Sequence, residues 1–292
     1  MAWPEVDLQL PSPEIEVKDD RLAAKGVRVI LKRDDLIHTH MPGNKWRKLK
    51  YNLQEAQRTG HDTLLTFGGA YSNHIRAVAA AGCYFGFKTV GVIRGEQHLP
   101  LNDTLAFATS CGMRLSYLDR GTYRNKHDPS VADALRERFG RFYLLPEGGS
   151  NALAVRGCAE LAAEIETDFD VICCACGTGG TIAGIAGSLR AGQRTIGFPV
   201  LKGAHFLYED IARLQREGLG KVSDNWTLAL DFHFGGFARK TRNLDEFIQD
   251  FRGRHGVELD WVYVAKMLYG VFVLVERRDF KPGTTIVGVV TG

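Results

Sequence analysis

The sequence predicts an α/β protein with two open, parallel-sheet domains, a smaller α/β domain being inserted into a larger one. Short apolar segments suited to strands alternate with segments of helical periodicity along nearly the whole chain. Parallel strands need such crossover helices, which then cover both faces of the sheet. Glycine-rich turns also follow several of the strands, where open parallel sheets bind ligands. At 292 residues the chain suits one large domain or two modest ones.

Residues 1–27 are polar and punctuated by proline, and we interpret them as an approach segment with little periodicity. After this segment, apolar runs bounded by turn residues predict strands. The predicted strands are Val27–Lys32, Thr63–Phe67, Thr89–Ile93, Arg114–Tyr117, Phe142–Leu145, Asp170–Cys176, Thr195–Pro199, Trp226–Phe232 and Thr285–Val290.

Apolar residues at helical spacing predict the helices that connect these strands. The first of them carries Leu49 and Leu53 on one face, and the second is rich in alanine. The predicted helices are 46–58, Asn73–Phe85, Asn102–Ser110, Ser130–Arg138, Ala152–Glu166, Ile182–Arg190, Phe206–Glu217, Leu244–Gly253 and Lys266–Glu276.

Two candidate domain boundaries lie near Lys48 and Ser150. They predict a large domain made of residues 1–48 and 151–292 and a small domain made of residues 49–150. No short-period repeat or low-complexity linker interrupts either part.

Composition excludes several classes of protein. The net charge of +3 gives no reason to expect nucleic acid or an anionic membrane as a partner. The longest apolar runs, such as Val171–Cys176, are too short to cross a bilayer. Residues 1–5 pass quickly into charged residues instead of opening a signal segment, so we expect a soluble cytoplasmic protein.

Six cysteines in a chain of this length do not form a disulfide framework. Along a strand, Cys174 and Cys176 point to one face and Cys173 to the other, and no second cluster lies at zinc-ligand spacing. We therefore expect small core thiols in a reducing compartment, and no metal.

Lys45 follows a Gly-Asn turn and lies in the first turn of a predicted helix. The helix dipole is positive at that end, and Arg47 and Lys48 crowd the same turn, so Lys45 should lose its proton more easily than a free lysine. A neutral amine is the nucleophile that a Schiff base to an aldehyde cofactor requires. Lys48 lies one turn deeper and Lys50 points elsewhere around the helix. The alternative is a basic helix start that is merely solvated.

The loop after the strand Asp170–Cys176 combines glycines with hydroxyl groups where backbone N–H groups and a helix dipole converge. It lacks the Gly-Lys-Ser/Thr of a nucleotide-binding P-loop, and Ile182 replaces the third glycine of the dinucleotide fingerprint. A site for one phosphate group fits it, and a threonine-capped turn is the alternative. Its residues are Gly177, Thr178, Gly179, Gly180 and Thr181.

Two further turns precede helices. In the first, Ser72 and Asn73 are candidate N-caps that offer hydroxyl, amide and N–H groups to a carboxylate or a ring oxygen, and His74 follows them. Capping alone also explains Ser72, and a local hydrogen bond also explains His74. The second turn, 147–151, again ends in Ser and Asn. Because no Gly-x-Ser-x-Gly is present, the sequence gives no support for a serine hydrolase.

Five motifs, in order over almost the whole chain, resemble the pyridoxal-phosphate enzymes of the 1-aminocyclopropane-1-carboxylate deaminase / D-cysteine desulfhydrase family. One such motif would be weak, but five in register are specific. They are Lys32-Arg33-Asp34-Asp35, Gly43-Asn44-Lys45-Trp46-Arg47-Lys48-Leu49, Gly68-Gly69-Ala70-Tyr71-Ser72-Asn73-His74, Glu147-Gly148-Gly149-Ser150-Asn151 and Gly177-Thr178-Gly179-Gly180-Thr181.

The resemblance implies the tryptophan-synthase β-like fold, with pyridoxal 5'-phosphate between the two domains and usually a homodimer. It implies that Lys45 carries the cofactor and that Gly177–Thr181 hold its phosphate. Asn73 would face the ring oxygen of the cofactor, and Thr291 its pyridine nitrogen. Ser72 would meet the carboxylate of a small amino-acid substrate or help move a proton, with Asn73 and His74 beside it. Tyr263 would stand over the substrate.

Three departures from the family pattern bear on the substrate. Val264 follows Tyr263, where the deaminase branch has a carboxylate, and Phe237 replaces a second active-site tyrosine. The neutral Thr291 supports a pyridinium less well than a carboxylate would. The sequence ends at Gly292, where the family continues through a glycine-rich turn, so either the chain is trimmed or the far edge of the cofactor is built differently.

These features lead to the hypothesis of β-elimination or deamination of a small amino acid, with D-cysteine favoured over the cyclopropane substrate. Lys45 would remove the Cα proton, with Ser72 and Tyr263 positioning the carboxylate and the leaving group. The alternatives are a 1-aminocyclopropane-1-carboxylate deaminase and a pyridoxal-phosphate-binding protein without turnover.

Overall fold

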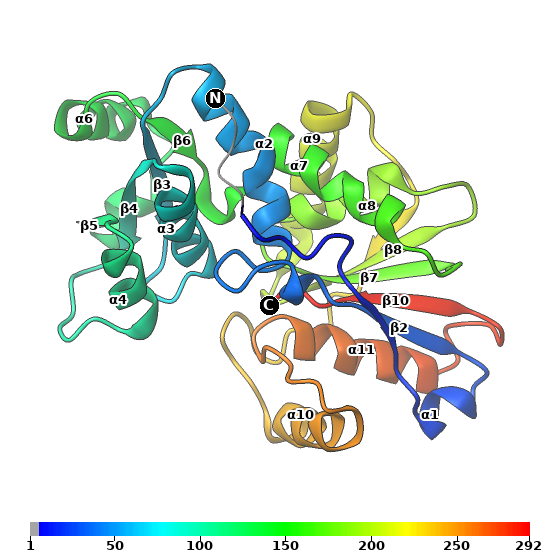
Figure 1. The fold of residues 1–292 in the computed structure, drawn as a ribbon. Coiled ribbons are helices and arrows are strands. Elements are labelled where there is room, and N and C mark those ends of the chain that lie inside the picture. The colour runs from blue at the N-terminus through cyan, green and yellow to red at the C-terminus, as the bar shows by residue number, and fades with distance from the viewer. Residues whose placement is uncertain (1–5) are drawn as a thin grey trace.

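The computed structural model describes residues 6–292, which form two α/β units, each built on its own sheet (Figure 1). The larger sheet has the strand order β1 (Glu14–Glu16), β2 (Arg28–Lys32), β10 (Thr285–Val289), β7 (Val171–Cys176), β8 (Arg194–Pro199) and β9 (Trp226–Leu228). The smaller sheet has the order β5 (Arg114–Leu118), β4 (Lys88–Arg94), β3 (Thr63–Gly68) and β6 (Tyr143–Leu145). All neighbouring strands are parallel except β1 and β2, so the predicted α/β class with parallel sheets is confirmed.

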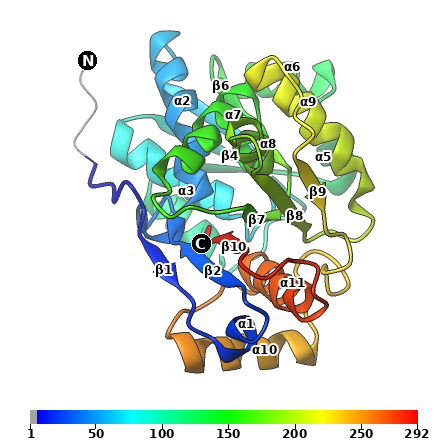
Figure 2. The ribbon, with the colours of Figure 1, turned by 90° about the vertical axis from the view of Figure 1, so that its right-hand side faces the viewer.

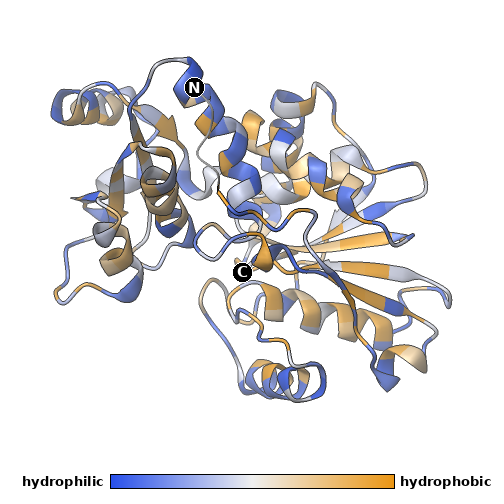
Figure 3. Ribbon diagram, in the orientation of Figure 1, coloured by the Kyte–Doolittle hydropathy of each residue, from blue (hydrophilic) through white to orange (hydrophobic). Residues whose placement is uncertain are grey.

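Helices cover both faces of the larger sheet, with α7, α8 and α9 on one side and α1, α10 and α11 on the other (Figure 2). The helices are α1 (Asp20–Ala23), α2 (Asn44–Arg58), α3 (Asn73–Phe85), α4 (Asp103–Ser110), α5 (Arg120–Arg124), α6 (Pro129–Phe139), α7 (Ala152–Ala159), α8 (Gly180–Ser188), α9 (Leu207–Leu219), α10 (Arg242–His255) and α11 (Val264–Glu276). This double cover explains why the central strands β7 and β10 are buried along their whole length and largely apolar (Figure 3).

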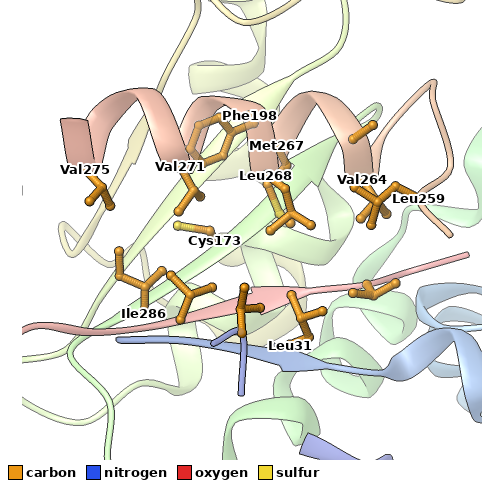
Figure 4. Close-up of a cluster of buried hydrophobic side chains, with 14 of the residues drawn as sticks. Leu31, Cys173, Phe198, Leu259, Val264, Met267, Leu268, Val271, Val275 and Ile286 are labelled. Atoms are coloured by element: carbon orange, nitrogen blue, oxygen red, sulfur yellow. The ribbon is translucent and has the colours of Figure 1, made fainter. Parts of the chain in front are cut away.

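The larger unit has one hydrophobic core on each face of its sheet. Beneath α11, Leu268 and Val271 pack against strand residues that include Leu31 and Cys173 (Figure 4). On the opposite face, Cys174 and Cys176 pack with residues of α8 and α9. The alternation predicted for these cysteines is therefore confirmed, and all six cysteines of the chain are free thiols.

Helix α2 connects the two units. Its apolar face, with Leu49 and Leu53, belongs to the core that the small unit builds around Ile75. Another side of α2 packs closely on α7 of the larger unit, because a Cβ at Gly157 would collide with the carbonyl oxygen of Arg47. The predicted boundary at residues 48 and 49 falls inside this helix, and the two boundaries stay predictions.

The approach segment, whose sequence shows little periodicity, contains two short regular elements. Glu14–Glu16 form β1, which pairs antiparallel with the edge strand β2, and Asp19 caps the short helix α1 by accepting from the Arg21 N–H at 2.9 Å. Three residues are too few to show the period of a strand, so this pairing with a distant strand could not be read from the sequence.

Other elements differ in extent. The predicted helix 152–166 consists of α7 followed by a 3-10 helix over Glu160–Glu164, and α5 was not predicted at all. The strand predicted to reach Phe232 ends at Leu228. Short elements and element ends depend on tertiary contacts more than on local periodicity.

Within residues 6–292, no helix is long and apolar enough to cross a membrane. In the same range, no group of three or more His, Cys, Asp or Glu side chains could hold a metal ion. The expectation that no signal segment opens the chain falls in part on residues 1–5, which lie outside the described residues.

Candidate active site

Close packing brings the three glycine-rich turns together at the junction of the two units. A Cβ at Gly148, after β6, would lie 2.8 Å from the side chain of Thr178, after β7. A Cβ at Gly149 would lie 2.7 Å from the ring of His74, in α3 after β3. The coincidence of turns at the carboxyl ends of parallel strands therefore holds in three dimensions.

The Gly177–Thr181 loop forms the N-terminal end of α8 and has the features of an anion site. The N-cap residue Gly179 has a φ of +78° and provides no side-chain cap, so the first N–H groups of the helix have no side-chain acceptor. The hydroxyl groups of Thr178 and Ser150 lie 2.6 Å apart beside this loop. A Cβ at Gly180 would collide with Ser150 Oγ, so only glycine leaves this space open.

Lys48 supplies the positive charge of this site. Its Nζ donates to Ser150 Oγ at 3.0 Å and to the carbonyl oxygen of Gly148 at 3.1 Å, and it lies 3.5 Å from Thr178 Oγ1. From the sequence, Lys48 is expected one turn deeper in the helix, with an effect on the pKa of Lys45 but no contact with a ligand. Lys48 follows Lys45 by three residues, which places both side chains on the same face of a helix. This spacing could have indicated from the sequence that Lys48 lies near the same site.

Lys45 lies at the start of α2, with its Nζ donating to Asn44 Oδ1 at 2.8 Å. Asn44 in turn donates from Nδ2 to Thr181 Oγ1 at 3.0 Å, so one side chain connects Lys45 to the anion loop. Burial lowers the pKa of Lys45 to about 7, with a further contribution from the ammonium of Lys48. At neutral pH a large fraction of this amine is therefore unprotonated, and an unprotonated amine is a nucleophile.

The cause of this low pKa differs in part from the expectation. Lys48 contributes, as expected, but Arg47 does not: its guanidinium donates to Asp34 Oδ2 at 2.7 Å and to Glu164 Oε2 at 2.7 Å. Lys50 points away from the site and pairs with Glu160 at 2.7 Å. Of the three lysines in this stretch, Lys45 and Lys48 therefore face the junction and Lys50 does not.

The turn before α3 holds Ser72, Asn73 and His74. Ser72 is the N-cap residue, and its Oγ accepts from the N–H of Ile75 at 3.3 Å. Asn73 and Ser72 are both partly exposed. His74 is 2% exposed, with Nε2 2.9 Å from Thr66 Oγ1, and burial lowers its pKa to about 3. His74 is thus a neutral ring packed behind Gly149, and its contact with a substrate stays a prediction.

Tyr263 and Thr291 complete the set of predicted residues. A Cβ at Gly177 would lie 3.4 Å from the ring of Tyr263, so this tyrosine stands over the anion loop. Burial raises the pKa of Tyr263 to about 12, with smaller contributions from Asp260 and Glu147. Thr291 is buried after β10, and its backbone passes so close to Gly43 that a Cβ there would collide with the Thr291 carbonyl.

Comparison with known proteins fits this geometry. A family model described as "Pyridoxal-phosphate dependent enzyme" matches residues 11–292. A Pyrococcus furiosus protein named "Putative 1-aminocyclopropane-1-carboxylate deaminase" is 32% identical over 281 residues, covering 91% of this chain and 85% of that protein. The bifunctional D-cysteine desulfhydrase/1-aminocyclopropane-1-carboxylate deaminase of Arabidopsis thaliana is 32% identical over 272 residues, covering 84% of this chain and 67% of that protein.

Solved structures agree. The crystal structure of an ACC deaminase homologue superimposes with a TM-score of 0.86 at 27% identity, covering 99% of this chain and 92% of that one. A hydrogen sulfide-producing enzyme from Fusobacterium nucleatum, 15% identical, shares the fold with a TM-score of 0.71 over 98% and 96% of the two chains. The family that the five motifs resemble is thereby confirmed, and with it the cofactor class. The chain belongs to the pyridoxal-phosphate-dependent enzymes, in the family of its relatives named 1-aminocyclopropane-1-carboxylate deaminase and D-cysteine desulfhydrase.

Proposed function

We propose that this enzyme removes the amino group of a small amino acid by β-elimination, with D-cysteine as the favoured substrate. The observation that carries the proposal is the placement of Lys45, an amine of lowered pKa, one side chain away from an anion loop lined by Lys48, Thr178 and Ser150. In this reaction D-cysteine and water give pyruvate, sulfide and ammonia.

The residues around the loop fit a phosphate group. Backbone N–H groups of Gly177–Thr181 and the ammonium of Lys48 are donors of the kind that a dianion requires, and the missing Cβ at Gly180 leaves room beside Ser150. We assign these residues to the phosphate, Asn73 to the ring oxygen and Thr291 to the pyridine nitrogen. When bound, the cofactor supplies an electron sink for negative charge that develops at the substrate Cα.

Lys45 has two functions in this proposal. Its amine would hold the cofactor covalently and, as a free amine, would take the proton from the substrate Cα. A pKa of about 7 suits both functions, because a base works best with a pKa near the working pH. The hydrogen bond from Nζ to Asn44 holds the amine beside the anion loop.

Ser72 and Tyr263 position the substrate. The helix start at Ser72 presents N–H groups and a hydroxyl, which suit the substrate carboxylate. Tyr263 remains protonated at neutral pH because its pKa is about 12, so it can donate a hydrogen bond or a proton to the leaving group.

Two side chains favour D-cysteine over the cyclopropane substrate. Position 264, where the deaminase branch has a carboxylate, is a valine in this chain. Its side chain is fully buried in the hydrophobic core. Phe237 contacts the ring of Tyr263 with 6.0 Å between ring centroids and brings no hydroxyl group. Cyclopropane opening therefore lacks one acid or base candidate. The names of the relatives keep 1-aminocyclopropane-1-carboxylate deaminase as the second candidate.

Turnover of four compounds by the cofactor-loaded enzyme tests the proposal: D-cysteine, L-cysteine, D-serine and 1-aminocyclopropane-1-carboxylate. We expect D-cysteine to give pyruvate and sulfide with the highest kcat/KM. A higher kcat/KM for the cyclopropane would favour the second candidate. No turnover of any amino acid would leave a protein that only binds the cofactor.

The assignment of Lys45 has its own test. Lys45→Ala should abolish the visible absorbance of the lysine-bound cofactor and the lysine adduct that borohydride fixes. Lys50→Ala is the matched control and should keep both, because Lys50 pairs with Glu160 away from the site. If the Lys45→Ala protein retained the absorbance and the adduct, another lysine would carry the cofactor.

A further inference from the structure

The loop between β9 and α10 has a strained backbone next to Tyr263. Phe234 and Ala238 have φ values of +54° and +50°, in a region that residues with a Cβ seldom adopt. Gly235 and Gly236, between them in the chain, also have positive φ values. Such a conformation persists only where surrounding contacts impose it.

Lys266 anchors this loop at two backbone positions. This side chain is 0% exposed, and its Nζ donates to the carbonyl oxygens of His233 at 3.0 Å and of Gly236 at 2.8 Å. A buried ammonium needs acceptors for its protons, and these two carbonyls are the ones the structure provides within residues 6–292. The lysine therefore clamps both ends of the His233–Gly236 turn onto α11.

The clamped turn carries Phe237 to Tyr263. The two rings meet edge to face at 6.0 Å, and Phe237 is 48% exposed although it is a large apolar side chain. Tyr263 lies three residues before Lys266, at the N-cap of α11, and stands over Gly177. One helix end thus fixes both rings, Tyr263 directly and Phe237 through the lysine.

We propose that Lys266 is a positioning residue, which holds Phe237 against Tyr263 as the wall that receives the substrate side chain. This inference rests on the proposed function, because the wall is a substrate wall only if Tyr263 stands over an amino-acid substrate. Two aromatic rings suit a thiol or a thioether, since divalent sulfur packs favourably at the edges of aromatic rings.

Hydrogen exchange and steady-state kinetics of Lys266→Met test the proposal in the cofactor-loaded enzyme. The amides of Gly235, Gly236 and Arg239 are hydrogen-bonded within the loop and should exchange about tenfold faster once the clamp is lost. KM for D-cysteine should rise about tenfold with kcat changed less than about threefold, because the wall contacts ground state and transition state alike. Absorbance of the bound cofactor should not change.

Two further variants serve as controls. Lys266→Arg keeps a cation with several donors and should restore part of the slow exchange. Lys240→Met removes an exposed lysine near the other end of the same loop, where it pairs with Asp245 at 2.7 Å, and should leave exchange in residues 233–239 unchanged. Lys266→Gln retains one donor group and tests the same contact if the methionine variant does not fold.

Unchanged exchange in residues 233–239 of Lys266→Met would overturn the proposal. So would a uniform rise of exchange throughout α11, which would give Lys266 a merely structural function. Hydrogen exchange requires no turnover, so it tests the clamp even if the wild-type enzyme converts no amino acid. A lack of turnover by the wild-type enzyme would refute the proposed function and not the clamp.

Discussion

The amine of Lys45 shows how the environment of one residue sets its chemistry. Burial is the largest cause of its lowered pKa, and the charge of Lys48 adds to it. The Nζ of Lys48 is itself held by Ser150 and Gly148, both in the turn after β6. The charge of Lys48 thus lies beside the Gly177–Thr181 loop and also lowers the pKa of the neighbouring amine.

This arrangement predicts the pH dependence of cofactor uptake. In cofactor-free enzyme, the rate of covalent pyridoxal-phosphate uptake should rise with pH around a midpoint of about pH 7, as the Lys45 amine loses its proton. Lys48→Met should move the midpoint to higher pH, because a charge that lowers the pKa is removed. Stopped-flow absorbance over a pH series measures the uptake rate and its midpoint pH. Lys50→Met, as control, should keep the wild-type midpoint, and an unmoved midpoint in Lys48→Met would contradict the assigned cause.

At the scale of elements, a buried ion network anchors α2, from which Lys45 and Lys48 project. Arg47 donates to Asp34 and Glu164, and the carbonyl oxygen of Asp34 accepts from the Gly43 N–H at 2.8 Å. Asp34 therefore holds the start of α2 through its side chain and the preceding loop through its backbone. Removing one partner would leave a buried carboxylate unpaired.

Arg47→Met should lower the free energy of unfolding by about 3–5 kcal/mol, the cost typical of breaking a buried ion pair. Urea denaturation measures this change. The matched control is Arg58→Met at the other end of α2, whose guanidinium pairs with Glu55 on the surface, and its cost should stay below about 1 kcal/mol. Equal costs for the two variants would show that the buried network does not anchor the helix.

A second element-scale prediction concerns the contact between the loop before α2 and the strand end after β10. Gly43 and Gly60 both have positive φ values, +53° and +67°, but a Cβ at Gly43 would collide with Thr291 while one at Gly60 meets nothing within 4 Å. Gly60→Ala should therefore cost only the backbone strain, about 1–2 kcal/mol. Gly43→Ala should cost more and also weaken pyridoxal-phosphate binding, because Thr291 or Lys45 must move. Urea denaturation and cofactor titration distinguish the two, and equal effects would argue against the collision.

At the scale of the whole molecule, the candidate site lies where the two α/β units meet. Residues from both units meet there, with Ser150 and Gly148 from the turn after β6 and Thr178 from the loop after β7. A ligand held by both units stabilises the folded state by mass action. The homodimer stays a prediction, which sedimentation equilibrium would test.

Pyridoxal phosphate should stabilise the folded enzyme by about 2.7 kcal/mol at a hundred times its Kd. Thermal denaturation with and without the cofactor measures the shift of the midpoint. Pyridoxal, which lacks the phosphate, should give a smaller shift at the same concentration if the Gly177–Thr181 loop holds that group. Equal shifts for the two compounds would argue against the loop as the phosphate site.

The sequence by itself determined the class of the fold, most of the elements and the turns that carry the candidate site. The helix Asn73–Phe85 has the predicted bounds because a serine cap, an alanine-rich face and a terminal glycine are all local signals. The five motifs and the choice of Lys45 were also available from the sequence, since each motif is contiguous along the chain.

Only the tertiary structure decided which distant side chains meet. It brought Lys48 to Ser150, 102 residues away, paired Arg47 with Asp34 and Glu164, and joined the His233–Gly236 turn to Lys266. It also added β1 to the sheet and buried His74. Periodicity and capping act over a few residues, whereas burial, charge pairing and sheet order depend on contacts between segments that only the folded chain brings together.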